Sequence, residues 1–252
     1  MIPYRDFVEF EKGTLPLIIS VPHGGKLVCE SIPKRKKGIH GIDGRTIELA
    51  RDLISSIRNV SRINMSIEQN PSYIISNVQR SKIDLNRKAS EAYNPDSLKG
   101  REIYRFYHDK INSQVLENIK LFNYSLLIDI HGFEKNKRPP GYRDVEIILG
   151  TNNLESFFNN PIPKKEWGNT LRGKIIENFL NLGIPIAPGH PRRNEYVLTG
   201  GFITQRYGAS KIPNAQALQI EFSDTIRLFD DKLRSLVLRT LAQTIFKKIS
   251  QT

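Results

Sequence analysis

Two short apolar runs, each followed by a histidine, constrain the fold of this chain more than any other feature. Residues 15–21 (LPLIISV) lead into Pro22-His23-Gly24, and residues 125–130 (SLLIDI) lead into His131-Gly132. Runs this short, apolar at nearly every position and rich in β-branched residues, are typical of strands that are covered on both faces of a sheet. The sequence therefore predicts a sheet between helical layers, with a histidine where each of two strands ends.

Helical patterns alternate with these strands along the chain. Apolar residues recur at helical spacing in four segments, residues 46–57, 101–122, 166–182 and 228–249. Further strands are predicted at residues 72–76, 144–149 and 217–222, and loops at residues 135–143 and 184–201. Such alternation predicts one α/β domain over residues 1–252, a three-layer α/β/α arrangement around a central mixed, mainly parallel sheet.

The net charge favours anionic ligands without indicating a nucleic-acid-binding protein. Lys and Arg number 38 against 26 Asp and Glu, a formal charge of +12. Apart from residues 34–37 (KRKK), the basic residues are scattered among acids, and aromatic residues do not interleave with them as a base-stacking surface requires. We therefore expect a small anionic ligand, and keep a metal-free polyanion-binding module as the rival hypothesis.

The sequence predicts neither a secretory signal nor a membrane span. Charges interrupt the apolar residues near the N-terminus, and no run of about 18 apolar residues occurs. We expect a cytoplasmic protein with no membrane partner. Cys29 is the only cysteine, so a metal site would have to use His and carboxylate ligands.

Three polar side chains stand at or near the ends of predicted strands. His23 and His131 follow two of them, and Glu221 lies inside the apolar strand ALQIEF at residues 217–222. Because the carboxyl ends of parallel strands meet at one edge of a sheet, we expect these side chains to lie together. A lone histidine there is commonly structural and Glu221 could face solvent, but the three together favour a metal-dependent site.

A catalytic zinc ion takes three protein ligands and leaves one position open. His23 and His131 would supply two. For the third we favour Asp43, although it could equally be a turn or helix-capping residue, and Glu134 is the local alternative in His-x-x-Glu spacing. We expect one metal ion per chain, zinc being favoured and manganese or iron left open. Asp129 would lie on the same strand face as His131 and accept its other ring N–H.

The remaining candidates concern catalysis and substrate binding. Glu221 would act as general base towards a metal-bound water that attacks a carbonyl. Arg87, beside Asn86, suits a substrate carboxylate or a developing oxyanion. Arg193 and Arg206 are further candidates for substrate binding, whereas the other histidines, at positions 40, 108 and 190, are taken as structural.

Five ordered motifs together resemble the N-formylglutamate amidohydrolase family. They are SVPHGG (residues 20–25), DLNR (84–87), DIHG (129–132), GGFIT (200–204) and QIE (219–221). That family is similar in fold to zinc carboxypeptidases and aspartoacylases, with a mixed sheet between helices and one zinc ion. The resemblance implies His23 and His131 as ligands, Glu221 as base, and Asn86 with Arg87 as binders of the substrate carboxylate.

The resemblance also implies the reaction, cleavage of an amide that joins a formyl or acyl group to an amino acid. Residues 191–196 (PRRNEY) depart from the motif expected ahead of the double glycine. We therefore predict a small anionic N-formyl or N-acyl amino acid as substrate, and keep a carboxypeptidase-like action on short peptides as the alternative.

Overall fold

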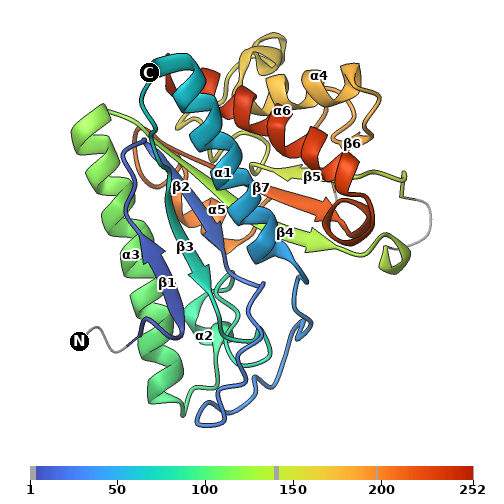
Figure 1. Ribbon diagram of the computed structural model, residues 1–252. Helices are drawn as coiled ribbons and strands as arrows, with labels where there is room; N and C mark the ends of the chain where they lie inside the picture. Colours follow the sequence, from blue (N-terminus) through green and yellow to red (C-terminus); the bar gives the residue numbers. More distant parts are fainter. Residues whose placement is uncertain (1–3, 139–141, 197, 252) are drawn as a thin grey trace.

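A computed structural model describes residues 4–138, 142–196 and 198–251, which form a seven-stranded sheet between helices (Figure 1). The strands are β1 (Val8–Glu11), β2 (Leu17–Val21), β3 (Ser72–Ser76), β4 (Ser125–Phe133), β5 (Ile147–Gly150), β6 (Ile186–Ala187) and β7 (Ala215–Ser223). The α-helices are α1 (Thr46–Met65), α2 (Ala89–Ala92), α3 (Leu98–Phe122), α4 (Leu171–Asn181), α5 (Phe202–Tyr207) and α6 (Asp231–Ile249).

The sheet has the strand order β1-β3-β2-β4-β7-β5-β6. Four neighbouring pairs are parallel, namely β3 with β2, β2 with β4, β4 with β7, and β5 with β6. The pairs β1 with β3 and β7 with β5 are antiparallel. The predicted three-layer α/β/α arrangement with a mixed, mainly parallel sheet is thus confirmed.

Different helices cover the two faces of the sheet (Figure 1). Leu17 and Ile19 of β2 point to the face covered by α1, α4 and α6, and Ile18 points to the face covered by α3 and α5. Successive side chains of a strand alternate between faces, so an unbroken apolar run serves both cores. The buried strands were predictable for this reason.

Side-chain caps explain where three helices begin. Ser97, Thr170 and Asp230 each accept a hydrogen bond from the backbone N–H three residues later. α3 therefore begins earlier than predicted, directly after Ser97. The helix predicted at residues 166–182 is divided at Thr170, with a 3-10 segment before the cap, and the helix predicted at residues 228–249 begins only after Asp230.

Two edge strands were not predicted. β1 reads VEFE and pairs only along one side with β3, and its two glutamates weaken the apolar signal of a strand. β6 has two residues and lies inside the predicted loop at residues 184–201. β5 also begins at Ile147, later than the predicted start at residue 144.

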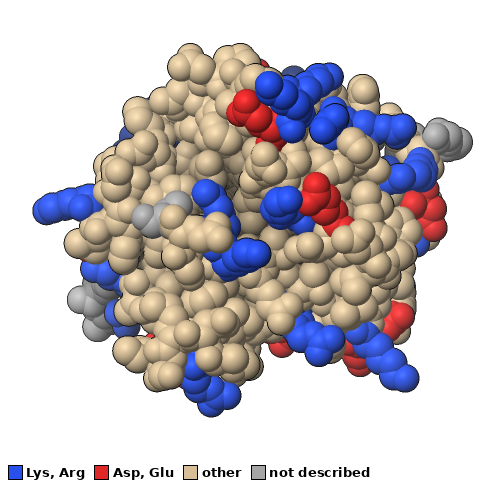
Figure 2. Space-filling view, turned by 90° about the horizontal axis from the view of Figure 1, so that it is seen from above, with Lys and Arg blue, Asp and Glu red and all other residues tan. Residues whose placement is uncertain are grey.

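One face of the molecule carries its positive charge in dispersed form. Figure 2, seen from above the view of Figure 1, shows Lys and Arg side chains spread over the face, with acidic side chains among them and broad neutral areas between. No stripe of basic side chains crosses this face. None of the helices in the described segments is long and apolar enough to cross a membrane.

Candidate active site

The sheet face covered by α3 and α5 becomes polar towards the carboxyl ends of β4 and β7. These strands pair in parallel, with Asp129 opposite Gln219 and His131 opposite Glu221. All four side chains share the face of the buried Leu127, because each strand alternates with a period of two. The register thus brings a histidine and a glutamate side by side at the end of the sheet.

His23 and Asp43 reach the same place from the end of β2 and from the loop before α1. The Asp43 backbone N–H donates to the His23 carbonyl oxygen at 3.0 Å. The Asp43 carbonyl oxygen accepts from the Thr46 N–H at 3.3 Å and from the Thr46 hydroxyl at 2.7 Å. The backbone of Asp43 therefore starts the helix, while its carboxylate does not cap it and faces the histidines.

Three possible ligand atoms converge on one point. His23 Nδ1 lies 3.1 Å from His131 Nδ1, and Asp43 Oδ2 lies 3.2 Å from His131 Nδ1 and 3.5 Å from His23 Nδ1. Tetrahedral zinc with bonds of about 2.0–2.1 Å holds its ligand atoms about 3.3–3.4 Å apart. Within the described residues, these side chains form the one group of three close enough to share a metal ion, and their spacing fits zinc.

The outer nitrogens of both rings face carboxylates. His23 Nε2 lies 2.7 Å from Asp84 Oδ1, and His131 Nε2 lies 2.8 Å from Asp129 Oδ2. A carboxylate can only accept a hydrogen bond from the ring, which assigns a hydrogen to each Nε2 and leaves a lone pair on Nδ1 of each neutral ring. Two such lone pairs 3.1 Å apart repel each other unless a cation lies against both. This arrangement is that of histidines prepared to bind a metal.

The charges at the centre are balanced by their neighbours. Burial alone would raise the pKa of Asp43, but the hydrogen bonds of His131 and His23 hold it well below its usual range. Burial would lower the pKa of His131, but Asp129 and Asp43 raise it well above its usual value. In the absence of a metal, a proton therefore supplies the positive charge that the carboxylates require.

Asp84 is buried and surrounded by three arginines. Its Oδ2 lies 3.1 Å from Arg80 Nε, 3.6 Å from an Arg35 terminal nitrogen and 3.8 Å from Arg87 Nε. Burial opposes ionisation, but His23, Arg80 and Arg35 hold the pKa of Asp84 well below its usual range. Asp84 is thus a permanent anion that orients His23.

Asp129 is supported by neutral groups instead. The Ser20 hydroxyl donates to Asp129 Oδ1 at 2.7 Å and lies 2.9 Å from the Tyr107 hydroxyl of α3. Both partners lie on the covered face of the sheet. The orientation of His131 is therefore fixed from within the core.

Glu221 lies beside the histidines and is 8% exposed. The Gln219 amide donates to Glu221 Oε1 at 2.8 Å. Burial raises the pKa of Glu221, and the positive charge of His131 partly opposes this rise. A carboxylate in such surroundings exchanges a proton closer to neutral pH than an exposed one, as a general base requires.

A cavity of about 780 Å³ opens over the centre, and its lining includes His23, Asp43, His131, Glu221 and Arg87. The Arg87 side chain is 43% exposed, so its guanidinium is available to a ligand.

Asn86 also lines this cavity, but its amide is engaged. Its Oδ1 accepts from the Ile203 N–H at 2.8 Å, and its Nδ2 lies 3.2 Å from His131 Nε2. A side chain at Gly201 would come within 2.2 Å of the Asn86 amide nitrogen, which explains why glycine stands there. Asn86 is therefore held by the start of α5 and lies against His131.

One buried guanidinium ties together the three segments that carry Asp43, His131 and Glu221. Arg227 donates to the carbonyl oxygens of Phe222 at 3.0 Å, Phe133 at 2.9 Å and Gly44. A side chain at Gly132 would lie 2.3 Å from Arg227 Nε, so glycine is required beside His131.

The other predicted site residues lie apart from the centre. Glu134 lines the cavity, but its carboxylate pairs with Lys137 at 3.1 Å and is outside the group of three ligands. Among the described residues that line the cavity, neither Arg193 nor Arg206 is found. Arg193 offers its carbonyl oxygen to a buried arginine of α4, and the Arg206 guanidinium lies over aromatic rings of α5.

Two arginines at the centre, Arg80 and Arg227, were not predicted from the sequence, and no role was assigned to Asp84. Arg80 spans two site carboxylates, with its NH1 3.3 Å from Asp43 Oδ1 and its Nε 3.1 Å from Asp84 Oδ2. Arg227 lies in a π-helical turn, Thr225–Phe229, that no local sequence pattern indicates. The one available signal was the position of Asp84 inside the DLNR motif.

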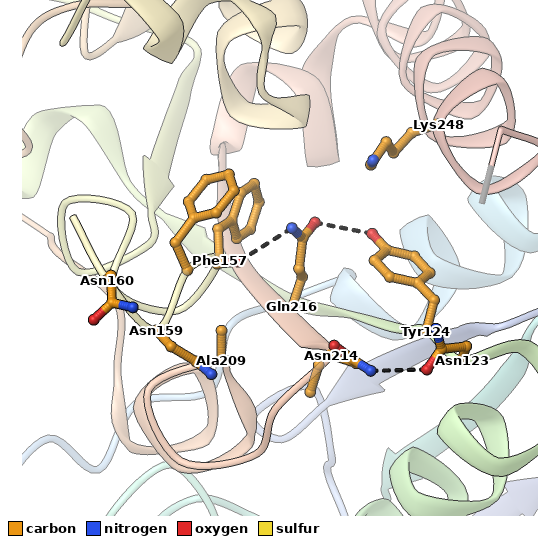
Figure 3. A pocket seen from close by; sticks show the side chains of 11 residues that line it. Asn123, Tyr124, Phe157, Asn159, Asn160, Ala209, Asn214, Gln216 and Lys248 are labelled. Carbon is orange, nitrogen blue, oxygen red and sulfur yellow. Dashed lines mark hydrogen bonds between the residues drawn. The ribbon is translucent and has the colours of Figure 1, made fainter. Parts of the chain in front are cut away.

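A second hollow, of about 460 Å³, lies at the opposite ends of the same strands (Figure 3). There the Tyr124 hydroxyl donates to Gln216 Oε1 at 2.9 Å, and the Gln216 amide donates to the Phe157 carbonyl oxygen at 3.2 Å. Asn214 similarly donates to the Asn123 amide oxygen at 2.8 Å. Apart from Lys248, the side chains drawn there are neutral at ordinary pH, so the carboxyl end is the candidate for chemistry.

Comparison with known proteins places the fold. No family model matches the sequence, and no curated protein is significantly similar to it. A crystal structure of N-formylglutamate amidohydrolase from Ralstonia eutropha JMP134 superposes with a TM-score of 0.66 at 14% identity, covering 98% of this chain and 99% of that one. A gene product from Agrobacterium tumefaciens gives a TM-score of 0.58 at 12% identity over 97% of this chain and 94% of that one. The chain therefore has the fold of the N-formylglutamate amidohydrolase structure over nearly its whole length.

Proposed function

We propose that this protein is a zinc-dependent hydrolase that cleaves the amide bond of a small anionic N-formyl or N-acyl amino acid. The observation that carries the proposal is the pair of Nδ1 atoms 3.1 Å apart, with Asp43 Oδ2 beside them and a carboxylate behind each ring. The likeness in fold to an N-formylglutamate amidohydrolase supports the choice of reaction.

His23, Asp43 and His131 would hold the zinc ion, with the Asp84 and Asp129 carboxylates fixing the rings. When bound, zinc would polarise the substrate carbonyl and lower the pKa of water to about 7. The donor set of two imidazoles and one carboxylate leaves a fourth position open, as catalytic zinc sites do.

Glu221 would accept a proton from the attacking water and deliver it to the nitrogen of the leaving amine. Its position opposite His131 on the neighbouring strand, and a pKa raised by burial, suit both transfers. Arg87, half exposed in the same cavity, would anchor the substrate carboxylate. Asn86, held by the Ile203 N–H of α5, would lie beside His131 in the same cavity.

The proposal is tested by zinc analysis and by hydrolysis of N-formylglutamate with purified, zinc-reconstituted protein. We expect about one zinc per chain and release of free glutamate. Glu221→Gln should keep its zinc and lose about 10²- to 10⁴-fold in kcat, because the proton acceptor is gone. Glu134→Gln is the matched control, since this glutamate lines the same cavity but pairs with Lys137.

Two results would contradict the proposal. One is reconstituted protein that retains no zinc, and the other is an equal effect of the two glutamine variants on turnover. Binding of polynucleotide with a steep dependence on salt, in place of hydrolysis, would favour the polyanion-binding rival.

A further inference from the structure

The cavity over the proposed active site is larger than a formyl amino acid requires. Its volume of about 780 Å³ lies in the upper part of the range of about 300–1,000 Å³ that is common for drug-sized ligands. The substrate class that we infer from the size and lining of this cavity rests on the proposed function.

The strand order sets out the side chains along the metal-competent part of the cavity. Along β2-β4-β7-β5, His23 follows β2, His131 and Glu221 lie on β4 and β7, and Ile148 lies on β5. Neighbouring strands are about 4.8 Å apart, so the three spacings from β2 to β5 span about 14 Å. Arg87 lines the same cavity from the loop after β3, with its Nε 3.8 Å from Oδ2 of Asp84, the carboxylate partner of His23.

Ile148 forms the apolar floor of the cavity at β5. It is the register partner of Glu221 in the antiparallel pair of β5 and β7, so both side chains point to the same face of the sheet. Ile147 and Leu149 point to the opposite face and belong to the core there. Ile148 is therefore an apolar side chain turned towards the cavity directly beside the proposed base.

Leu198 lines the same cavity from a segment that is packed on β5. The Thr199 carbonyl oxygen accepts a hydrogen bond from the Asn152 N–H. A side chain at Gly150 would come within 2.4 Å of the Gly200 nitrogen, so the two backbones approach as closely as glycines allow. Leu198 is thereby held at the cavity wall, where it is half-buried.

We propose that the acyl group removed by this enzyme is an alkyl chain of several carbons, held against Ile148 and Leu198 while Arg87 holds the carboxylate of the amino acid. A formyl group has no carbon beyond its carbonyl and leaves the half-buried Leu198 in contact with water, whereas an alkyl chain covers the exposed part of its side chain. The C–N bond of the amide breaks and a C–O bond to water forms. The products are an alkyl carboxylate and the free amino acid, whose amine receives the proton carried by Glu221.

The test is a series of N-formyl-, N-acetyl-, N-butyryl- and N-hexanoylglutamate with zinc-reconstituted protein, following release of glutamate. A formyl carbonyl is intrinsically more reactive, so the decisive comparison is acetyl with hexanoyl, whose carbonyls are alike. Each buried methylene should raise kcat/KM by about fourfold, or about 10²-fold from acetyl to hexanoyl.

A pair of leucine variants locates the effect. Leu198→Ala should lower the preference for hexanoyl over acetyl by about tenfold, because part of the apolar wall is lost. Leu116→Ala is the matched control, since Leu116 is exposed on α3 away from the cavity lining, and it should keep the wild-type preference.

The outcomes separate this inference from the proposed function. Hydrolysis that is fastest with formyl, slower with acetyl and slowest with hexanoyl overturns the alkyl-chain inference and leaves the amidohydrolase proposal standing. A chain-length preference that is equal in Leu198→Ala and Leu116→Ala overturns the assignment of the wall. Absence of hydrolysis across the whole series overturns both proposals.

Discussion

The two ends of β4 and β7 differ in chemistry although the same strands form both. At the carboxyl end, His131 and Glu221 are buried beside other ionisable groups. At the amino end, Tyr124, Gln216 and Asn214 meet their hydrogen-bonding needs with neutral partners (Figure 3). Each end therefore closes the sheet, but the carboxyl end does so with a cluster of buried ionisable groups, whereas Lys248 is the one charged residue among the described residues that line the hollow at the amino end.

This difference indicates that the carboxyl end of β4 and β7 is the candidate for chemistry, whereas the amino end contributes to stability. Burying charged groups costs several kcal/mol per ion and is only partly offset by pairing, whereas amides and hydroxyls can be satisfied at much smaller cost. Strongly shifted pKa values gather where chemistry is performed. Substitutions at the two ends should therefore separate activity from stability.

The largest expected effect is loss of the metal. His131→Ala removes one of the three proposed ligands, and we expect zinc to fall from about one per chain to none, with hydrolysis falling to background. Elemental analysis and an amide hydrolysis assay measure both. Gln216→Ala, at the amino end of β7, should retain its zinc and its turnover. Equal zinc loss in the two variants would break the comparison.

The second effect is on the pH dependence of stability. Burial, with the nearby charge of Arg206, lowers the pKa of His108 to about 3. In the unfolded chain this histidine takes up a proton near pH 6.5. The contribution of neutral His108 to the free energy of unfolding is therefore fully present above pH 6.5 and is lost as the pH falls towards 3.

In His108→Gln this loss should be absent, and the free energy of unfolding should change by about 3 kcal/mol less between pH 6.5 and pH 4. Denaturant titrations across this range provide the measurement. Tyr124→Phe, at the opposite end, should follow the pH slope of the wild type. An unchanged slope in His108→Gln would assign the acid sensitivity to other groups.

A smaller effect is expected for the carboxylate behind His23. Asp84→Asn keeps the shape but removes the negative charge that orients the ring, and zinc affinity should fall by about 10- to 100-fold. Competition with a chelator measures the dissociation constant. Asp52→Asn, on the exposed side of α1, is the control. Equal affinity in both variants would show that Asp84 serves only the arginines around it.

The smallest effect belongs to the amino end. Tyr124→Phe removes the hydrogen bond to Gln216 and should lower the free energy of unfolding by about 1 kcal/mol. Zinc content and kcat/KM should not change. A loss of turnover without a loss of stability would give the hollow in Figure 3 a part in function and would end the division between the two ends.

Much of the fold followed from local pattern. The apolar runs at β2 and β4 must be covered on both faces of the sheet. The helices that connect β2, β3 and β4 in sequence predict that these strands run parallel. β1 was not predicted because two of its four residues are glutamate. The helices α3 and α4 begin at other residues than predicted because Ser97 and Thr170 cap them. Edge strands and caps depend on single side chains, which carry weaker signals than burial.

The site was partly predictable for the same reason. His23, His131 and Glu221 stand at or near strand ends, where position in sequence predicts position in space. The guanidinium groups of Arg80 and Arg227 contact residues that are far away in the sequence, and no periodic pattern predicts such contacts. Only the tertiary structure shows that these arginines hold the site together.

The clamp formed by Arg227 has a consequence for how the protein matures. The segments that it joins, next to Asp43, His131 and Glu221, all leave the ribosome before Arg227 does. Until that residue has been made, the three segments that carry these site residues lack their common tether. The proposed metal site therefore reaches its final geometry only after Arg227 has been synthesised.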